Sequence, residues 1–159
     1  YNAGIARDNL MAFMSPREWD EVIETNVNGF YNTIQPLVFG MLAKKRGRIV
    51  AVSSASGQTG QAGQVNYSAS KAAVIGLTRA LAKEMGPSGI RVNCIAPGVI
   101  DTDMNARLSA DDMAALAGET PLCRIGTPEE AAEAIFYLAS DKARFITGAV
   151  LNVNGGIVI

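Results

Sequence analysis

Two short apolar runs separated by a helical pattern constrain the fold of this chain more than any other feature. Residues 48–53 and 90–96 are rich in β-branched side chains and do not alternate between apolar and polar positions, which is typical of parallel strands covered on both faces. Between them, residues 66–85 carry apolar positions at helical spacing and end at a Gly-Pro pair, a helix stop signal. This order predicts a βαβ unit with a right-handed crossover.

The flanking sequence continues the alternation of helices and strands. Residues 15–18 (Ser-Pro-Arg-Glu) and 127–130 (Thr-Pro-Glu-Glu) each place a hydroxyl three residues before a glutamate, the capping-box pattern that begins a helix. Residues 26–29 (Asn-Val-Asn-Gly) predict a kink or short break in the first helix, because asparagine and glycine are poor helix-interior residues. A last strand is expected over 149–153. The prediction is a single α/β domain over residues 1–159, built on a doubly wound, Rossmann-like parallel sheet.

The composition argues against several classes of protein. The 159 residues are 48% hydrophobic and 18% charged, with a formal net charge of -1 and no basic stripe for nucleic acid. No apolar stretch approaches the roughly 20 residues that span a bilayer. Cys94 and Cys123 are isolated in sequence, which favours free thiols in a reducing compartment over a disulfide or a metal site. We therefore expect a cytoplasmic protein with no metal, no membrane and no nucleic-acid partner.

Tyr67 and Lys71 lie four residues apart near the start of the helix predicted over residues 66–85. They therefore share one helix face, where the lysine charge favours the phenolate and lowers the phenol pKa. Chance supplies such a pair in many chains of this length, so the pair alone is weak evidence. The histidine-free sequence does exclude histidine as the acid or base.

Three predicted strand ends strengthen the case for a site near this pair. Residues 2–4 (Asn-Ala-Gly), 53–54 (Ser-Ser) and 97–98 (Pro-Gly) each follow a strand or a strand exit. The carboxyl ends of parallel strands meet at one edge of a sheet, and ligands bind there. The sequence therefore predicts a crevice at this edge, close to Tyr67 and Lys71.

The combined motifs resemble the short-chain dehydrogenase/reductase family, and within it the 3-oxoacyl-[acyl-carrier-protein] reductases. The motifs are Asn2-Ala3-Gly4, Asn26, Ser54, Asn66-Tyr67-x-x-x-Lys71 and Pro97-Gly98-x-x-x-Thr102. Residues 47–50, 90–93 and 121–156 extend the likeness over essentially the whole chain. The resemblance implies reduction of a 3-oxoacyl group carried by acyl carrier protein, in fatty acid biosynthesis, with NADP(H) favoured over NAD(H). It also implies a homotetramer or homodimer, formed through the helices around residues 27–45 and 66–85.

The resemblance implies a role for each matching residue of the reaction centre. Tyr67 is expected to donate the proton to the substrate oxygen, and Ser54 to hydrogen-bond that oxygen. Lys71 is expected to hold the nicotinamide ribose hydroxyls and to lower the Tyr67 pKa. Asn26 is expected to position a water that links Lys71 to solvent, and Gln64 is a candidate on the substrate side. On the residues alone, Ser54 also fits a turn serine and Asn26 a helix-break asparagine.

The resemblance places the cofactor against a second group of residues. Asn2 and Gly4 are expected on the adenosine side, where glycine admits close backbone contact. Ile100 and Thr102 are expected at the nicotinamide carboxamide and a nearby phosphate, through the backbone and the hydroxyl respectively.

Part of the family's pattern is absent from this sequence. The Gly-rich dinucleotide turn is missing, as is the residue that selects NAD or NADP, and the spacing of Gly57, Gly60 and Gly63 does not replace that turn. We therefore expect the chain to be the C-terminal part of a longer enzyme, with the first strands of the sheet missing.

Two alternatives remain open. One is the same mechanism on another carbonyl or alcohol, such as acetoacetyl-CoA, a sugar or a small secondary alcohol. Residues 103–126, which are interpreted as a lid, would determine which substrate binds. The other is a non-catalytic fragment without a complete cofactor site. A serine hydrolase is disfavoured because no histidine is present to activate Ser54.

Overall fold

A parallel sheet lies at the centre of the computed structural model, which describes residues 1–105 and 108–159. Within these residues the sheet has the strand order β1-β2-β3, with β1 at Gly47–Val52, β2 at Ile90–Pro97 and β3 at Val150–Val153. The helices are α1 (Pro16–Ile23), α2 (Gly29–Lys44), α3 (Ser56–Thr59), α4 (Val65–Met85), α5 (Ala110–Glu119) and α6 (Pro128–Ala139).

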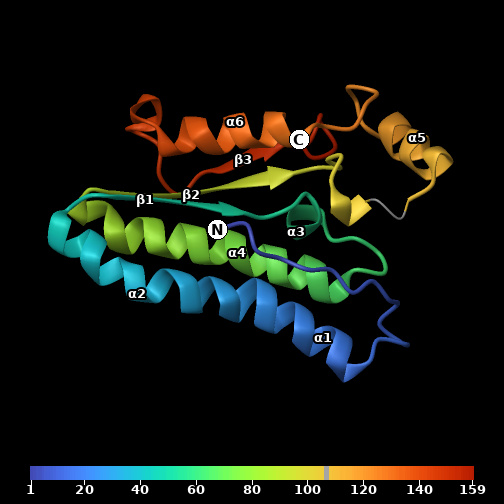
Figure 1. Cartoon of the computed structure of the whole chain (residues 1–159), viewed down its shortest axis with the longest axis horizontal. Coiled ribbons are helices and arrows are strands. Elements are labelled where there is room, and N and C mark those ends of the chain that lie inside the picture. The colour runs from blue at the N-terminus through green and yellow to red at the C-terminus, as the bar shows by residue number, and fades with distance from the viewer. Residues whose placement is uncertain (106–107) are drawn as a thin grey trace.

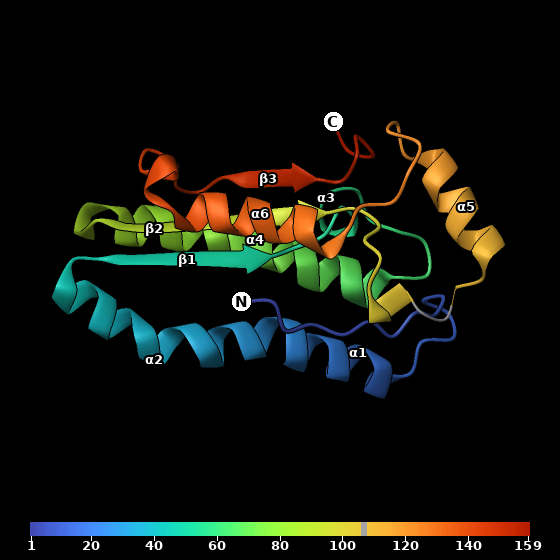
Figure 2. The ribbon, with the colours of Figure 1, turned by 45° about the horizontal axis from the view of Figure 1, so that its top comes forward.

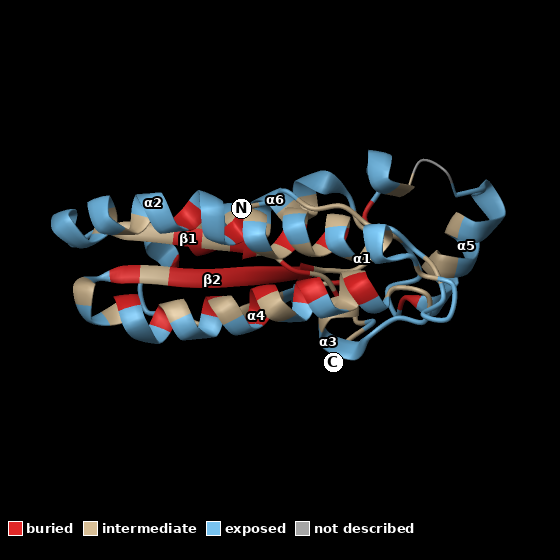
Figure 3. Ribbon diagram, turned by 90° about the horizontal axis from the view of Figure 1, so that it is seen from below, coloured by how far each residue is buried: buried red, intermediate tan, exposed pale blue. Residues whose placement is uncertain are grey.

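Helices cover both faces of the sheet. α2 and α4 lie on one face and α6 on the other (Figures 1 and 2). β2 is buried along most of its length between these layers, whereas the outer surfaces of the helices are exposed (Figure 3). The layering explains why the strand sequences do not alternate, because both faces of β2 pack against helices.

The core forms where α2 and α4 pack on β1 and β2. Phe30 and Met85 are among its largest fully buried side chains, and Val74, Ile90 and Val92 belong to the same buried cluster. Burying each of these aliphatic or aromatic side chains contributes about 1.5–3 kcal/mol. The core therefore fixes α4 against the sheet, which in turn fixes the position of the residues on the first turns of α4.

The predicted βαβ unit is confirmed. β1 pairs in parallel with β2, from Gly47 opposite Ile90 to Val52 opposite Ile95, and α4 connects the two strands. The last strand is also confirmed, with β3 parallel to β2. Both capping boxes begin helices as expected, at Ser15 for α1 and at Thr127 for α6.

The expected kink or short break at residues 26–29 takes the form of a π-helical turn that separates α1 from α2, while the backbone between them stays helical. Glu24–Asn28 form a π-helical turn, labelled η1, and Asn28 and Gly29 keep right-handed helical dihedral angles. The low helix propensity of asparagine is offset because both the oxygen and the nitrogen of the buried Asn26 amide are hydrogen-bonded. Such π-helical turns are frequent at functional sites.

The opening residues of the chain lie beside β1. The Tyr1 backbone nitrogen donates to Val50 O at 2.7 Å, and Val52 N donates to Tyr1 O at 3.0 Å. The Tyr1 ring packs edge-to-face on Phe30, with 5.3 Å between ring centroids. Residues 2–4 therefore leave the sheet at its carboxyl edge.

The segment interpreted as a lid contains more regular structure than its sequence suggested. Asp103–Asn105 form a single 3-10 turn, and α5 begins at a capping box in which Ser109 Oγ accepts a hydrogen bond from Asp112 N. Residues 106–107 of this segment lie outside the described residues. Its action as a lid stays a prediction.

None of the helices in the described part of the chain combines the length and the apolar character needed to cross a membrane.

Candidate active site

The three predicted strand ends meet at one edge of the sheet. Ser53 N donates to Ile95 O at 2.9 Å, and Ala55 N donates to Pro97 O at 2.8 Å. Gly98 N in turn donates to Val153 O at 3.1 Å. The serine pair after β1 and the Pro-Gly pair after β2 are thus held side by side, as expected for the ligand-binding edge of an open parallel sheet.

Lys71 projects from α4 to this edge and is almost completely buried, with 4% of its surface exposed. Its Nζ donates a hydrogen bond to Val52 O at 2.9 Å, at the end of β1. A Cβ at Gly4 would lie 3.1 Å from Nζ, so the glycine lets the chain pass close to the ammonium. Burial lowers the pKa of Lys71 from 10.5 to about 8.

Tyr67 lies one turn before Lys71 on the same face of α4. The Lys71 Nζ is 5.6 Å from the centroid of the Tyr67 ring, so the structure brings the pair together as the sequence predicted. The expected fall in the Tyr67 pKa was wrong for this arrangement. Burial raises the pKa of the phenol, the Ser54 hydroxyl lowers it and the Asp8 carboxylate raises it. Burial is the largest of these effects, and the Lys71 ammonium donates its hydrogen bond to Val52 O rather than to the phenol.

Ser54 lies against the Tyr67 phenol, whose pKa its hydroxyl lowers. Its Oγ also accepts a hydrogen bond from Ser56 N at 3.2 Å. The preceding residue, Ser53, is buried and donates its own hydroxyl to Lys71 O at 2.8 Å. This serine was missed as a positioning residue, although its place at the end of an apolar strand was visible in the sequence.

Gly57 allows the serine loop to pack directly on α4. A Cβ at this position would lie 2.7 Å from the carbonyl carbon of Lys71 and 3.0 Å from Ala72 N. Any larger side chain would force the short helix α3 away from α4. Gly57 thus serves the close packing of α3 on α4. This role agrees with the sequence prediction that Gly57 does not belong to a dinucleotide-binding turn.

Asn26 lies at the bottom of the site and is 1% exposed. Its Oδ1 accepts from Ile5 N at 2.8 Å, and its Nδ2 donates to Ile5 O at 3.0 Å and to Ser70 Oγ at 2.9 Å. A Cβ at Gly4 would lie 3.4 Å from Oδ1. Asn26 and Lys71 therefore flank the same glycine, as a shared site requires.

The substrate-side candidate lies at the N-terminal end of α4. Gln64 is the N-terminal cap residue of α4, and its Nε2 donates to Asp8 Oδ2 at 2.8 Å. The fully buried Asn66 donates to Arg7 O and to Glu18 O. Asn66 was part of the recognised motif but had no predicted role, and in the structure it ties α4 to the opening loop and to α1.

The expected cofactor residues lie at the same edge but do not all converge. Asn2 is exposed beside Gly4, whereas Ile100 and Thr102 follow β2. The Ile100 carbonyl accepts from Asn105 Nδ2 at 2.7 Å, and the exposed Thr102 hydroxyl lies 3.5 Å from that carbonyl. A groove of about 660 Å³ runs beside Ile100, between residues 120–126 and 152–159.

The residues present fit a nicotinamide nucleotide at this edge. Gly4 carries no side chain where the chain passes Lys71 and Asn26, and an ammonium with one backbone acceptor has two further N–H groups to donate to hydroxyl oxygens. The Thr102 hydroxyl is exposed and able to donate to a phosphate oxygen.

Nearly the whole chain is similar to known proteins. Residues 1–158 match a family model described as "Enoyl-(Acyl carrier protein) reductase". The chain is 46% identical to the 3-oxoacyl-[acyl-carrier-protein] reductase of Vibrio harveyi, over 98% of this chain and 64% of the relative. It is 49% identical to the enzyme of the same name from Chlamydia muridarum, over 98% of this chain and 63% of the relative.

A solved structure has the same fold. The crystal structure of 3-oxoacyl-[acyl-carrier protein] reductase from Brucella melitensis superposes with a TM-score of 0.95 at 39% identity. The match covers 99% of this chain and 61% of that chain. This chain thus spans less than two thirds of the length of the relatives that it matches.

Proposed function

Because the chain belongs to the short-chain dehydrogenase/reductase family, we propose that it reduces a 3-oxoacyl thioester on acyl carrier protein to the 3-hydroxyacyl form, with NADPH. The observation that carries the proposal is the convergence of Tyr67, Ser54 and Lys71 at the carboxyl edge of β1. Two hydroxyls and one ammonium in a largely buried site are what a ketone oxygen needs as it gains negative charge.

The protonation states support Tyr67 as the proton donor. A phenol whose pKa is raised by burial is protonated at neutral pH. Lys71, with a pKa of about 8, is mostly charged at neutral pH and stabilises the phenolate left by proton transfer. Ser54 donates a second hydrogen bond to the substrate oxygen. A bound nicotinamide nucleotide supplies the hydride.

The remaining residues of the site hold or resupply these groups. We propose that Asn26 positions a water through which Lys71 exchanges protons with solvent, since both residues flank Gly4. Gln64 is proposed to lie on the substrate side. Asn2 and Gly4 are proposed to approach the adenosine half of the cofactor, and Ile100 and Thr102 its nicotinamide half.

The reaction is tested by offering the full-length protein two substrates. NADPH oxidation is followed with a 3-oxoacyl thioester and with a 2-enoyl thioester of the same chain length. We expect turnover of the 3-oxoacyl substrate, because Ser54 and Tyr67 converge on a single oxygen. Faster turnover of the enoyl substrate would contradict the proposal and favour the activity in the family model's description.

We extend this proposal to the cofactor, the carrier protein and the domain that the chain belongs to. We propose that residues 1–159 form the C-terminal portion of one Rossmann-like domain in a cytoplasmic homotetramer, with acyl carrier protein presenting the substrate. The greater length of the matching 3-oxoacyl-[acyl-carrier-protein] reductases supports the domain proposal, and their names support the carrier protein as partner. We expect NADPH to bind the full-length protein more than tenfold more tightly than the 159-residue chain, which lacks a Gly-rich phosphate turn. Equal affinities in a fluorescence titration, with NADH as the comparison, would contradict the domain proposal.

A further inference from the structure

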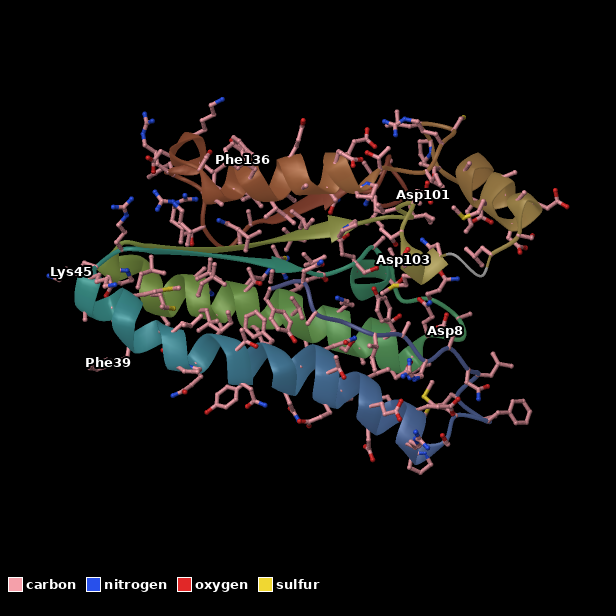
Figure 4. All side chains as sticks on the ribbon, viewed as in Figure 1. Asp8, Phe39, Lys45, Asp101, Asp103 and Phe136 are labelled. Carbon is pink, nitrogen blue, oxygen red and sulfur yellow. The ribbon has the colours of Figure 1, made fainter. Side chains whose placement is uncertain are left out.

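A carboxylate outside the proposed proton-transfer group lies at the entrance of the site. Asp8 follows the Asn2-Ala3-Gly4 turn and lies near the N-terminal end of α4 (Figure 4). Its Oδ2 accepts a hydrogen bond from Gln64 Nε2 at 2.8 Å. Asp8 is exposed, so this hydrogen bond is not needed to compensate a buried charge.

Gln64 connects Asp8 to the serine loop. Its other amide atom, Oε1, accepts a hydrogen bond from Ser56 Oγ at 3.2 Å. The backbone nitrogen of Ser56 donates to Ser54 Oγ, also at 3.2 Å. A chain of hydrogen bonds therefore runs from Asp8 through Gln64 and Ser56 to Ser54.

The charge of Asp8 determines the orientation of the Gln64 amide. An ionised carboxylate only accepts hydrogen bonds, so it draws the NH₂ group of Gln64 towards Asp8 and leaves the carbonyl oxygen for Ser56. The two loops are already joined by their backbones, since Asn9 N donates to Gly63 O at 2.8 Å. The Asp8 side chain is thus not required to hold the loops together, and its contribution is to orient Gln64.

The Asp8 carboxylate also affects the pKa of Tyr67, which lies three residues after Gln64 in the sequence. After burial, which is the larger cause, the negative charge of Asp8 raises the pKa of the phenol. Within residues 1–105 and 108–159, charged groups near the phenol are Asp8, from the opening loop, and Lys71, from α4.

We infer that Asp8 is a positioning residue of the active site, which orients Gln64 and, through Ser56, fixes the Ser54 hydroxyl that binds the substrate oxygen. The inference rests on the proposed function, because the Ser54 hydroxyl binds a substrate oxygen only if the protein is a carbonyl reductase. Asp8 itself touches no reacting atom.

Kinetics of the full-length protein test this inference. Asp8→Ala removes the acceptor and is expected to lower kcat/KM about tenfold, mainly through kcat, because the hydrogen bond from Ser54 strengthens as the substrate oxygen gains charge in the transition state. Gln64→Glu alone sets two carboxylates against each other and should have a similar effect. Combining Asp8→Asn with Gln64→Glu places the amide donor at position 8 and the carboxylate acceptor at position 64. This double variant restores the hydrogen bond and should recover most of the activity.

Asp20→Asn is the matched control, because it removes an equal charge from an exposed position on α1. It is expected to leave kcat/KM within about twofold of the parent. Unchanged kcat/KM in Asp8→Ala, or no recovery in the double variant, would overturn the inference.

A second readout does not depend on turnover. The Tyr67 phenol is titrated by ultraviolet difference spectroscopy, with Tyr67→Phe identifying its signal. Asp8→Asn should lower the Tyr67 pKa, whereas Asp20→Asn should not, and equal titration curves would count against the inference. If the parent fails to reduce 3-oxoacyl thioesters, the proposed function fails while this titration still decides the effect of Asp8.

Discussion

Burial sets the protonation of Tyr67 and Lys71 before any ligand binds. It raises the pKa of the phenol and lowers that of the ammonium, because both charged forms lose solvation. Sequence reasoning paired the two residues correctly, since a spacing of four fixes a shared helix face. It gave the wrong direction for the Tyr67 pKa, because burial of the phenol depends on the folded structure and cannot be read from the spacing of two residues.

The Lys71 pKa predicts an unusual dependence of stability on pH. Its folded-state pKa of about 8 is below the value of 10.5 expected for an unfolded chain, so the unfolded state binds more protons between these pH values. The free energy of unfolding contributed by Lys71 therefore rises from pH 8 to 10.5, and the buried charge costs up to about 3 kcal/mol below pH 8.

Urea unfolding of cofactor-free, full-length Lys71→Met is expected to show this cost directly. The variant should be more stable than the parent at pH 7 by about 1–3 kcal/mol, after loss of the hydrogen bond to Val52 O. The difference should shrink by pH 10, and reductase activity should be lost. A variant less stable than the parent at both pH values would show that Lys71 is not held as a buried charge.

At the scale of elements, the fold was predictable where the sequence pattern was local. The expected strand over residues 48–53 is β1 at Gly47–Val52, and the expected helix over residues 66–85 is α4 at Val65–Met85. The form of the interruption, the π-helical turn η1, was not predictable, because the Asn26 amide in it is hydrogen-bonded to Ile5, 21 residues away in sequence. α5 was missed although Ser109 and Asp112 have the spacing of a capping box, since its apolar pattern is weak.

The packing of α3 on α4 predicts opposite effects for two glycine substitutions. Gly57→Ala places a Cβ 2.7 Å from the Lys71 carbonyl carbon and is expected to destabilise the protein by about 1–3 kcal/mol. It should also lower kcat, because the loop that carries Ser54 moves away from Tyr67.

Gly76→Ala on α4 is the matched control, since a Cβ there meets no atom within 4 Å. It is expected to stabilise the protein by about 1 kcal/mol through higher helix propensity. Urea unfolding and steady-state kinetics distinguish the two variants. Equal stability of both would contradict the proposed close contact between α3 and α4.

At the scale of the whole molecule, exposed aromatic side chains lie on both helical layers. Phe39 on α2 is 80% exposed and Phe136 on α6 is 75% exposed, and Figure 4 shows them on opposite outer surfaces. The sequence predicted an interface on the α2 and α4 side, whereas the α6 surface was not expected. Two separate interfaces are what a tetramer with dihedral symmetry requires.

Light scattering of the full-length protein tests the assembly. We expect the parent to have the mass of a tetramer, and Phe39→Glu and Phe136→Glu each to have the mass of a dimer, because a charge in an apolar interface is costly to bury. The control is Glu133→Gln, an exposed α6 position at which the change should leave the mass unaltered. A monomeric parent would exclude both interfaces.

The central claim is that Tyr67 donates the proton at a site completed by Ser54 and Lys71. The most direct measurement compares kcat and NADPH affinity for full-length Tyr67→Phe, which removes one hydroxyl and keeps the ring. We expect kcat to fall by at least about a thousandfold, the upper range for a general acid, with the dissociation constant for NADPH within about threefold of the parent. Turnover at the parental rate with intact cofactor binding would contradict the account.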